Sequence, residues 1–129
     1  MLKEIRLLEP FKCNPDDSCV EVARKLRDSM QRHIYVVNEE DWPIGIISTT
    51  DINNKIVAEG KDPNEVKARE IMSEPIDVYD VSEDEVRVYK EMISKKRLTC
   101  AVVENKRFVG ILTLNRLIGY ITGIKNGNR

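Results

Sequence analysis

Apolar residues recur along the chain in two spacings, one typical of amphipathic helices and one typical of short buried strands. Over residues 19–30 and again over residues 86–93 they return every three or four positions, which predicts a helix with one apolar face in each segment. Each segment is followed by two short apolar runs, rich in β-branched residues, that flank a polar turn. Runs of this kind favour β-hairpins. The paired runs are residues 34–37 with 44–47, and residues 100–103 with 108–112.

Local signals mark where helices begin and end. Ser18 with Glu21, and Ser82 with Glu85, have the spacing of a capping box, which predicts the starts of these two helices. A second helix in the first half is predicted to stop at Gly60, because glycine is favoured just after a helix. The remaining predicted elements are extended segments at 11–13 and 76–78 and second helices at 50–60 and 114–124.

The chain reads as two copies of one β-α-β-β-α unit. A shift of 66 residues aligns many apolar positions in order, and the shift becomes 65 after one deletion in the hairpin turn, where loops absorb such changes. Matching stretches include residues 3–5 with 69–71 and residues 45–48 with 110–113. We therefore predict an α/β (α+β) fold made of a first repeat, residues 1–62, and a second repeat, residues 63–129.

Each repeat has too few residues to bury a comfortable core alone, so we expect the two halves to cover each other's sheets. The positions expected to be buried are Val20, Val22, Leu26, Val36, Ile46, Val86, Met92, Val102 and Ile111. We also expect the second helices to leave an apolar face that supports a homodimer. That face would contain Ile52, Ile56, Leu117, Ile118 and Ile121.

Composition excludes several classes of protein. Lys and Arg number 21 and Asp and Glu number 22, whereas a dedicated nucleic-acid binder has a basic excess, so we do not expect nucleic acid as a partner. No apolar run approaches the ~20 residues of a membrane span, and the N-terminus lacks the apolar region of a signal peptide. An odd number of cysteines, Cys13, Cys19 and Cys100, favours a reducing compartment, and we expect the cytoplasm. With the single His33 they fit no common zinc spacing, so no metal site is predicted.

Several stretches resemble the CBS-domain family, in the order in which that family has them. Residues 45–52, Gly-Ile-Ile-Ser-Thr-Thr-Asp-Ile, resemble its signature at a strand-to-helix junction, in which Ser or Thr is followed by aspartate three positions later. Residues 32–37 resemble its Arg-His-Leu-Pro-Val-Val strand, and residues 11–15 resemble the extended piece that ends in proline. Residues 58–63 and 69–72 resemble the link into a second copy.

The resemblance implies a tandem CBS pair, packed sheet to sheet about a pseudo-twofold axis. Such pairs often bind AMP, ADP, ATP or S-adenosylmethionine in clefts, and they commonly dimerise and usually regulate another protein. The adenosine compound would then be a regulatory ligand, and no cofactor is expected to be required. Two alternatives remain open: a CBS module that binds partner proteins without a ligand, and a CBS protein that binds nucleic acid. We do not expect an enzyme, because His33 has no nucleophile or metal set around it in the sequence.

The first repeat carries the groups expected to hold a nucleoside. Asp51 is a carboxylate with two acceptor oxygens, which match the two vicinal hydroxyl donors of a ribose. Ser48 and the N–H groups of Thr49 and Thr50 are predicted at a helix N-terminus, where a phosphate is favoured. The alternative is that Ser48, Thr49, Thr50 or Asp51 simply caps the helix. Both roles are compatible if Thr49 or Thr50 is the cap.

Further contacts are expected on the neighbouring strands and in the second repeat. Lys12 and Cys13 could offer backbone groups to an adenine edge, and Ile34 or Tyr35 could pack against the ring. In the second repeat Thr113 keeps the hydroxyl, but Arg116 replaces the aspartate, and a guanidinium only donates. Arg116 therefore suits a phosphate, or is simply a solvated helix arginine, and the second cleft is predicted to lack the usual nucleoside site.

Overall fold

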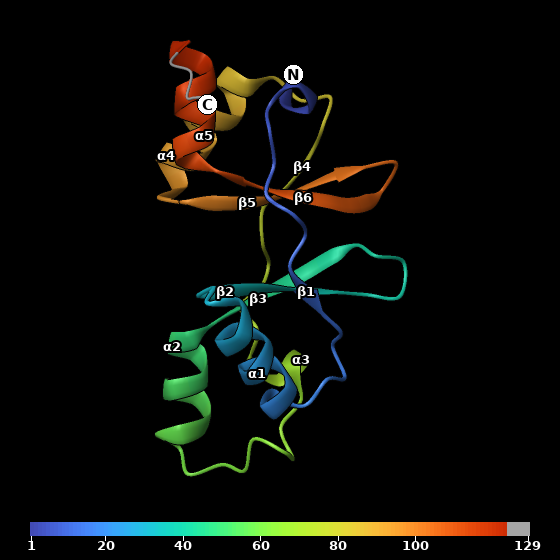
Figure 1. Ribbon diagram of the computed structural model, residues 1–129, viewed down its shortest axis with the longest axis vertical. Coiled ribbons are helices and arrows are strands. Elements are labelled where there is room, and N and C mark those ends of the chain that lie inside the picture. The colour runs from blue at the N-terminus through green and yellow to red at the C-terminus, as the bar shows by residue number, and fades with distance from the viewer. Residues whose placement is uncertain (124–129) are drawn as a thin grey trace. The chain divides into compact units, whose positions relative to one another are not determined.

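The structure is a computed structural model that describes residues 1–123, and it contains two three-stranded sheets with helices. The chain divides into two compact units. One unit contains Phe11–Ile76, and the other contains Met1–Pro10 together with residues 77–123 (Figure 1). We call them the Asp51 unit and the Arg116 unit, after the residues at the equivalent position of each.

The Asp51 unit has a three-stranded sheet with strand order β1-β2-β3. β1 is parallel to β2, and β2 is antiparallel to β3. The helices lie on one face of this sheet (Figure 1). The elements in chain order are β1 (Lys12–Cys13), α1 (Cys19–Ser29), β2 (His33–Val37), β3 (Pro43–Ser48), α2 (Thr49–Ile52), the π-helical turn η2 (Asn53–Val57) and α3 (Ala68–Ile71).

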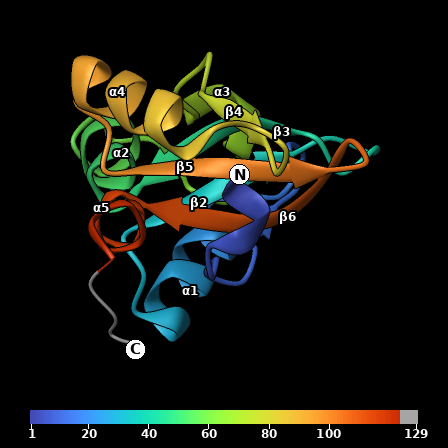
Figure 2. The ribbon, with the colours of Figure 1, turned by 90° about the horizontal axis from the view of Figure 1, so that it is seen from above.

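The Arg116 unit repeats the same topology, with strand order β4-β5-β6, a parallel first pair and an antiparallel second pair. α4 and α5 lie side by side on one face of the sheet (Figures 1 and 2). The elements are the 3₁₀ turn η1 (Leu2–Glu4), β4 (Val78–Asp80), α4 (Glu85–Lys95), β5 (Thr99–Glu104), β6 (Arg107–Thr113) and α5 (Leu114–Thr122). The predicted β-α-β-β-α order is confirmed in both repeats.

The helix starts follow local hydrogen bonding. The Ser18 hydroxyl accepts from the Glu21 N–H at 3.2 Å, which confirms the capping box of α1. The cap of α4 is Asp84, whose carboxylate accepts from the Arg87 N–H at 3.0 Å. The prediction that Ser82 caps this helix is wrong, because the Ser82 hydroxyl donates instead to Asp80 Oδ1 at 2.8 Å.

The second helix of each repeat ends differently from the prediction. α2 continues into the π-helical turn η2, which ends at Val57, three residues before Gly60. Gly60 then adopts a φ of +67°, a conformation that favours glycine. α5 ends at Thr122, with Gly123 as its left-handed cap, and the predicted end at residue 124 lies outside the described residues.

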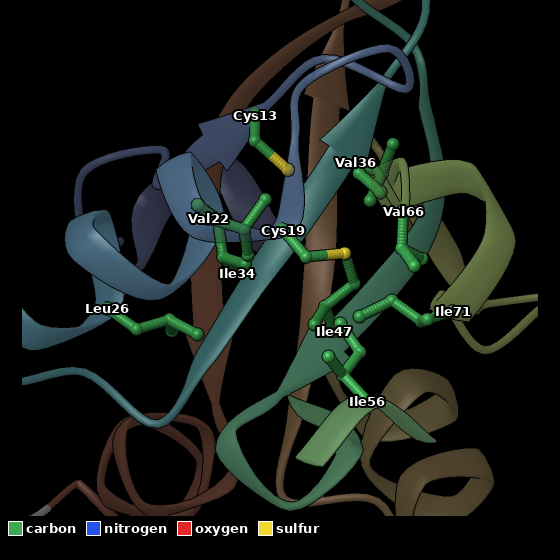
Figure 3. Packing of buried hydrophobic residues seen from close by; sticks show 11 residues of the cluster. Cys13, Cys19, Val22, Leu26, Ile34, Val36, Ile47, Ile56, Val66 and Ile71 are labelled. Atoms are coloured by element: carbon green, nitrogen blue, oxygen red, sulfur yellow. The ribbon is translucent and has the colours of Figure 1, made fainter. Parts of the chain in front are cut away.

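Each unit has its own cluster of buried apolar side chains. In the Asp51 unit these side chains lie between the sheet and the helices (Figure 3). Of the positions expected to be buried, Val22, Leu26, Val36, Met92, Val102 and Ile111 are buried. Val20 and Ile46 are half-buried, and Val86 is 41% exposed because Val88 and Met92 define the buried face of α4.

The expected apolar outer face of the second helices is smaller than predicted. Ile56 and Leu117 belong to the two cores and are fully buried. Ile52 and Ile118 are half-buried, and Ile121 is exposed. The 3.6-residue period placed all five on helices, but it could not separate the inner stripe from the outer one.

The three cysteines are free and buried. Burial raises the pKa of the Cys13 and Cys100 thiols to about 12 and that of Cys19 to about 11. A neutral buried thiol behaves as a small apolar side chain, and Cys13 and Cys19 pack in the same core (Figure 3).

The compact units do not coincide with the sequence segments 1–62 and 63–129. Residues 1–10 pack in the Arg116 unit, and residues 63–76 pack in the Asp51 unit. We call residues 2–8 and 68–73 the lead-in segments. Each one pairs at a single point with the last strand of a sheet, Leu8 with Ile111 in β6 and Ser73 with Ile46 in β3. Because β6 and β3 are edge strands, these bridges cover part of an otherwise open edge.

Candidate ligand-binding site

The junction between β3 and α2 is built by reciprocal capping. Ser48, the last residue of β3, has an extended backbone, and its hydroxyl accepts from the Asp51 N–H at 3.0 Å. Asp51 Oδ2 in turn accepts from the Ser48 N–H at 2.8 Å. Ser48 is therefore the cap. The idea that Thr49 or Thr50 caps this helix is wrong.

The Asp51 carboxylate is largely shielded but reachable, since its side chain is 16% exposed. Asp51 Oδ1 lies 3.2 Å from Lys55 Nζ, one turn along the same helix. Lys55 Nζ also donates to the carbonyl of Ile71, at 2.8 Å. A carboxylate has about four acceptor positions, so the Ser48 N–H and the Lys55 ammonium leave capacity for two hydroxyl donors.

One backbone N–H group at this junction already has a hydrogen-bond partner. The Thr49 N–H, expected to meet a phosphate, donates to the carbonyl of Arg32 at 3.0 Å. The side chains of Thr49 and Thr50 are exposed at the start of α2. The helix is therefore tied to the residue before β2, and Ser48 and Thr50 are the remaining candidates for a phosphate.

The residues expected to contact a base lie on the paired strands β1 and β2. Lys12 is opposite Tyr35, and Cys13 is opposite Val36. The Lys12 ammonium forms an ion pair with Asp41 Oδ1 at 2.7 Å, and the Cys13 side chain is buried. Ile34 lies in the apolar core, whereas Tyr35, also buried, alternates to the other face of the strand.

Thr113 and Arg116 belong to the Arg116 unit. Thr113 caps α5, and its hydroxyl accepts from the Arg116 N–H at 3.2 Å. The Arg116 guanidinium donates through Nη1 to the carbonyl of Arg6 at 3.0 Å. Arg116 therefore holds the lead-in segment of its own unit through one of the five N–H donors of its guanidinium.

Both units thus present the same strand-to-helix junction, with a Ser or Thr cap three residues before a charged side chain. This arrangement agrees with the comparison to known families, in which residues 2–58 and 68–123 each match the CBS domain. The chain belongs to the CBS-domain family.

Similar proteins include one curated sequence. The chain is 35% identical over 106 residues to Uncharacterized protein MK0525 of Methanopyrus kandleri. The match covers 81% of this chain and 54% of that protein, so the chain spans about half the length of the curated relative it matches.

Solved structures support the CBS-pair fold. Hypoxic Response Protein I with two coordinated zinc ions matches with a TM-score of 0.78 at 20% identity, over 91% of this chain and 95% of that one. The CBS domain pair of protein MJ0100, in complex with 5′-methylthioadenosine and S-adenosyl-L-methionine, matches with a TM-score of 0.74 at 26% identity. That match covers 97% of this chain and 98% of the other.

The ion pairs of two carboxylates in this CBS pair, Asp51 and Asp77, were not predicted from the sequence. Lys55 could have been found, because it lies four residues after Asp51, the spacing of a helical ion pair. In the Arg116 unit, Asp77 pairs with Lys95 at 2.8 Å and with Arg97 at 3.1 Å. Burial opposes ionisation of Asp77, but hydrogen bonds from Lys95 and Arg97 outweigh it and hold the pKa of that carboxyl below its ordinary value.

The described part of this CBS pair meets neither the requirements of a metal site nor those of a membrane-spanning helix. Within residues 1–123, no group of three or more His, Cys, Asp and Glu side chains is arranged to hold a metal ion. None of the helices in this part of the chain has the length and apolar character needed to span a bilayer.

Proposed function

We propose that this CBS pair is a regulatory sensor, without catalytic activity, that binds one adenosine-type ligand per chain and acts on a partner protein. The observation that carries the proposal is the asymmetry between Asp51 and Arg116. The same junction presents a reachable carboxylate in one unit and a guanidinium committed to a carbonyl in the other. Only the carboxylate can accept hydrogen bonds from ribose hydroxyls.

The proposed binding mode uses the groups on β1, β2 and α2. Asp51 accepts from the two ribose hydroxyls, and Ser48, whose hydroxyl proton remains available, donates to a phosphate. Backbone groups of Lys12 and Cys13 meet the adenine edge, and Tyr35 packs against the ring. Support is weaker for Ile34, which is in the core, and for Thr49, whose N–H is already bonded. Thr113 and Arg116 have the least support, because both belong to the Arg116 unit, whose junction lacks the carboxylate.

The class of ligand is also supported by one relative. The MJ0100 pair was solved with S-adenosyl-L-methionine and 5′-methylthioadenosine. These two compounds share with AMP and ATP an adenosine whose ribose carries two vicinal hydroxyls. An aspartate that binds those hydroxyls would bind every ligand of this class. Selectivity among them would depend on the protein groups that contact the 5′ substituent.

Calorimetric titration tests the proposal directly. With AMP, ATP and S-adenosylmethionine offered separately, we expect at least one of them to bind with a stoichiometry of one per chain. Binding should also raise the free energy of unfolding by about 2.7 kcal/mol at a ligand concentration of 100 Kd. Two equal sites per chain would contradict the assigned asymmetry, and absence of binding by all three would refute the proposed function.

A ligand-free interaction module is the second candidate, favoured by one observation. Both Asp51 oxygens already have partners, Ser48 N–H and Lys55, so the carboxylate has a structural role without any ligand. This candidate predicts no change in melting temperature with any of the three compounds. The three free cysteines fit either candidate in a reducing compartment such as the cytoplasm.

We also propose that the protein forms a homodimer. Apolar side chains remain exposed on α4, on α5 and at Leu98, which follows α4: Ile93, Leu98 and Ile121. Exposed apolar groups on neighbouring helices favour association with a complementary surface, and a second copy provides one. Light scattering at high micromolar concentration is expected to give twice the mass of the chain. A monomer mass would contradict this, and Ile121→Glu should reduce the dimer fraction.

A further inference from the structure

A cation on the second helix of each repeat holds a main-chain carbonyl of the adjacent lead-in segment. In the Asp51 unit, Lys55 Nζ donates to the carbonyl of Ile71 at 2.8 Å. In the Arg116 unit, Arg116 Nη1 donates to the carbonyl of Arg6 at 3.0 Å. The two cations occupy different positions in their repeats, so the shared feature is the contact and not the residue.

The two lead-in segments are equivalent, because they pair with equivalent strand positions. Ser73 exchanges two hydrogen bonds with Ile46, of 2.8 and 3.1 Å, and Leu8 exchanges two with Ile111, both of 2.9 Å. Ile46 and Ile111 correspond in the repeat alignment. Each lead-in segment is therefore held by one bridge to the edge strand and by one cation from the following helix.

The two contacts differ in one respect that concerns ligand binding. Arg116 stands at the repeat position of Asp51, so in its unit the cation replaces the carboxylate. In the Asp51 unit the carboxylate is kept, and the cation lies one turn later, with its ammonium 3.2 Å from Asp51 Oδ1. Lys55 thus contacts both the carboxylate proposed to read a ribose and the segment that precedes the exit of the chain from this unit after Ile76.

We propose that Lys55 is a positioning residue whose hold on the segment Ile71–Ser73 depends on the charge of Asp51, so that a ligand engaging Asp51 loosens this segment. Ribose hydroxyls that donate to the unoccupied lone pairs of the carboxylate draw on the same negative charge, so they weaken its attraction for the Lys55 ammonium. The ammonium is then held less firmly over the Ile71 carbonyl. The ligand part of this inference rests on the proposed function, whereas the link between Asp51, Lys55 and Ser73 does not.

Hydrogen exchange without ligand tests that link. The Ser73 amide is the probe, and the Leu8 amide in the equivalent bridge of the other unit is the internal reference. Lys55→Met is expected to accelerate exchange at Ser73 about tenfold relative to Leu8, and Lys55→Arg should restore most of the protection. Lys61→Met, at an exposed lysine of the same unit, is the control and should leave Ser73 unchanged.

A double-mutant cycle separates the proposed coupling from simple packing by Lys55. Asp51→Asn keeps an acceptor oxygen for the Ser48 N–H but removes the charge that fixes Lys55. It should accelerate Ser73 exchange, and the double variant with Lys55→Met should exchange no faster than Lys55→Met alone. Additive effects, or an unchanged Ser73 amide in Asp51→Asn, would overturn the inference.

The ligand arm uses AMP as the probe. Saturating AMP should accelerate Ser73 exchange relative to Leu8 in the wild type. By thermodynamic reciprocity, Lys55→Met should bind AMP at least about threefold more tightly than the wild type. AMP binding with unchanged or weaker affinity in Lys55→Met would refute the competition. Failure of AMP, ATP and S-adenosylmethionine all to bind the wild type would count against the proposed function alone, because the ligand-free cycle still decides the link.

Discussion

Replacing Asp51 with alanine is expected to weaken AMP binding at least tenfold. The change removes two hydrogen bonds from ribose hydroxyls to a carboxylate, each worth about 1.5–3 kcal/mol, and ~1.4 kcal/mol corresponds to one decade of affinity. Isothermal titration calorimetry with AMP on the wild type and the variant measures the change. Equal affinity in the two proteins would exclude Asp51 from the ligand site.

The controls follow from the second role of this side chain. Because the Asp51 carboxylate also accepts from the Ser48 N–H, alanine should cost about 1 kcal/mol of folding stability as well. Asp51→Asn keeps that acceptor, so it should lose AMP affinity with a smaller loss of stability. Glu59→Ala removes an exposed carboxylate of the same unit and should leave the affinity unchanged.

Replacing Gly110 with alanine is expected to destabilise the fold by up to about 3 kcal/mol, the upper range for overpacking a tight site. A Cβ at this position would lie 2.6 Å from Leu7 Cβ and 2.9 Å from the carbonyl oxygen of Leu8. The bridge between Leu8 and Ile111 fixes these atoms, so either the lead-in segment detaches or β6 shifts. Urea unfolding measures the loss, and an unchanged midpoint would contradict the close approach.

Gly45 provides the matched comparison in the other unit. A Cβ there would lie 2.5 Å from Met72 Sδ and 2.8 Å from Met72 Cγ. These atoms belong to a flexible side chain that can rotate away, whereas Leu8 presents a backbone atom to Gly110. Gly45→Ala should therefore cost less than Gly110→Ala. The reverse order would show that the two lead-in segments are held differently from the arrangement described here.

The repeat, its element order and the family were all predictable from sequence. Apolar spacing identified the helices and hairpins because buried faces repeat with the period of each element. Capping signals were less reliable. Ser18 was found correctly, but Ser82 was chosen over Asp84, because several residues before α4 can each cap a helix and only the backbone path selects one.

The candidate site was predictable in part. Ser48 and Asp51 were placed at a helix start, which is where they lie. Their mutual capping was left open, since either hydroxyl or carboxylate could have satisfied the same N–H groups. The commitment of Arg116 to Arg6 was not predicted, because the two residues lie 110 positions apart and no local pattern connects them.

What the sequence alone determined is therefore the periodic and local part of the protein: two β-α-β-β-α repeats, their junctions, and the exchange of Asp51 for Arg116 between them. Only the tertiary structure decided which lead-in segment packs with which sheet, why Gly45 and Gly110 recur, and which cation holds each segment. The physical reason is the separation along the sequence of the residues in contact. Helix and strand patterns arise from contacts within a few residues, whereas these features depend on pairings such as Leu8 with Ile111, whose partners are separated by most of the chain.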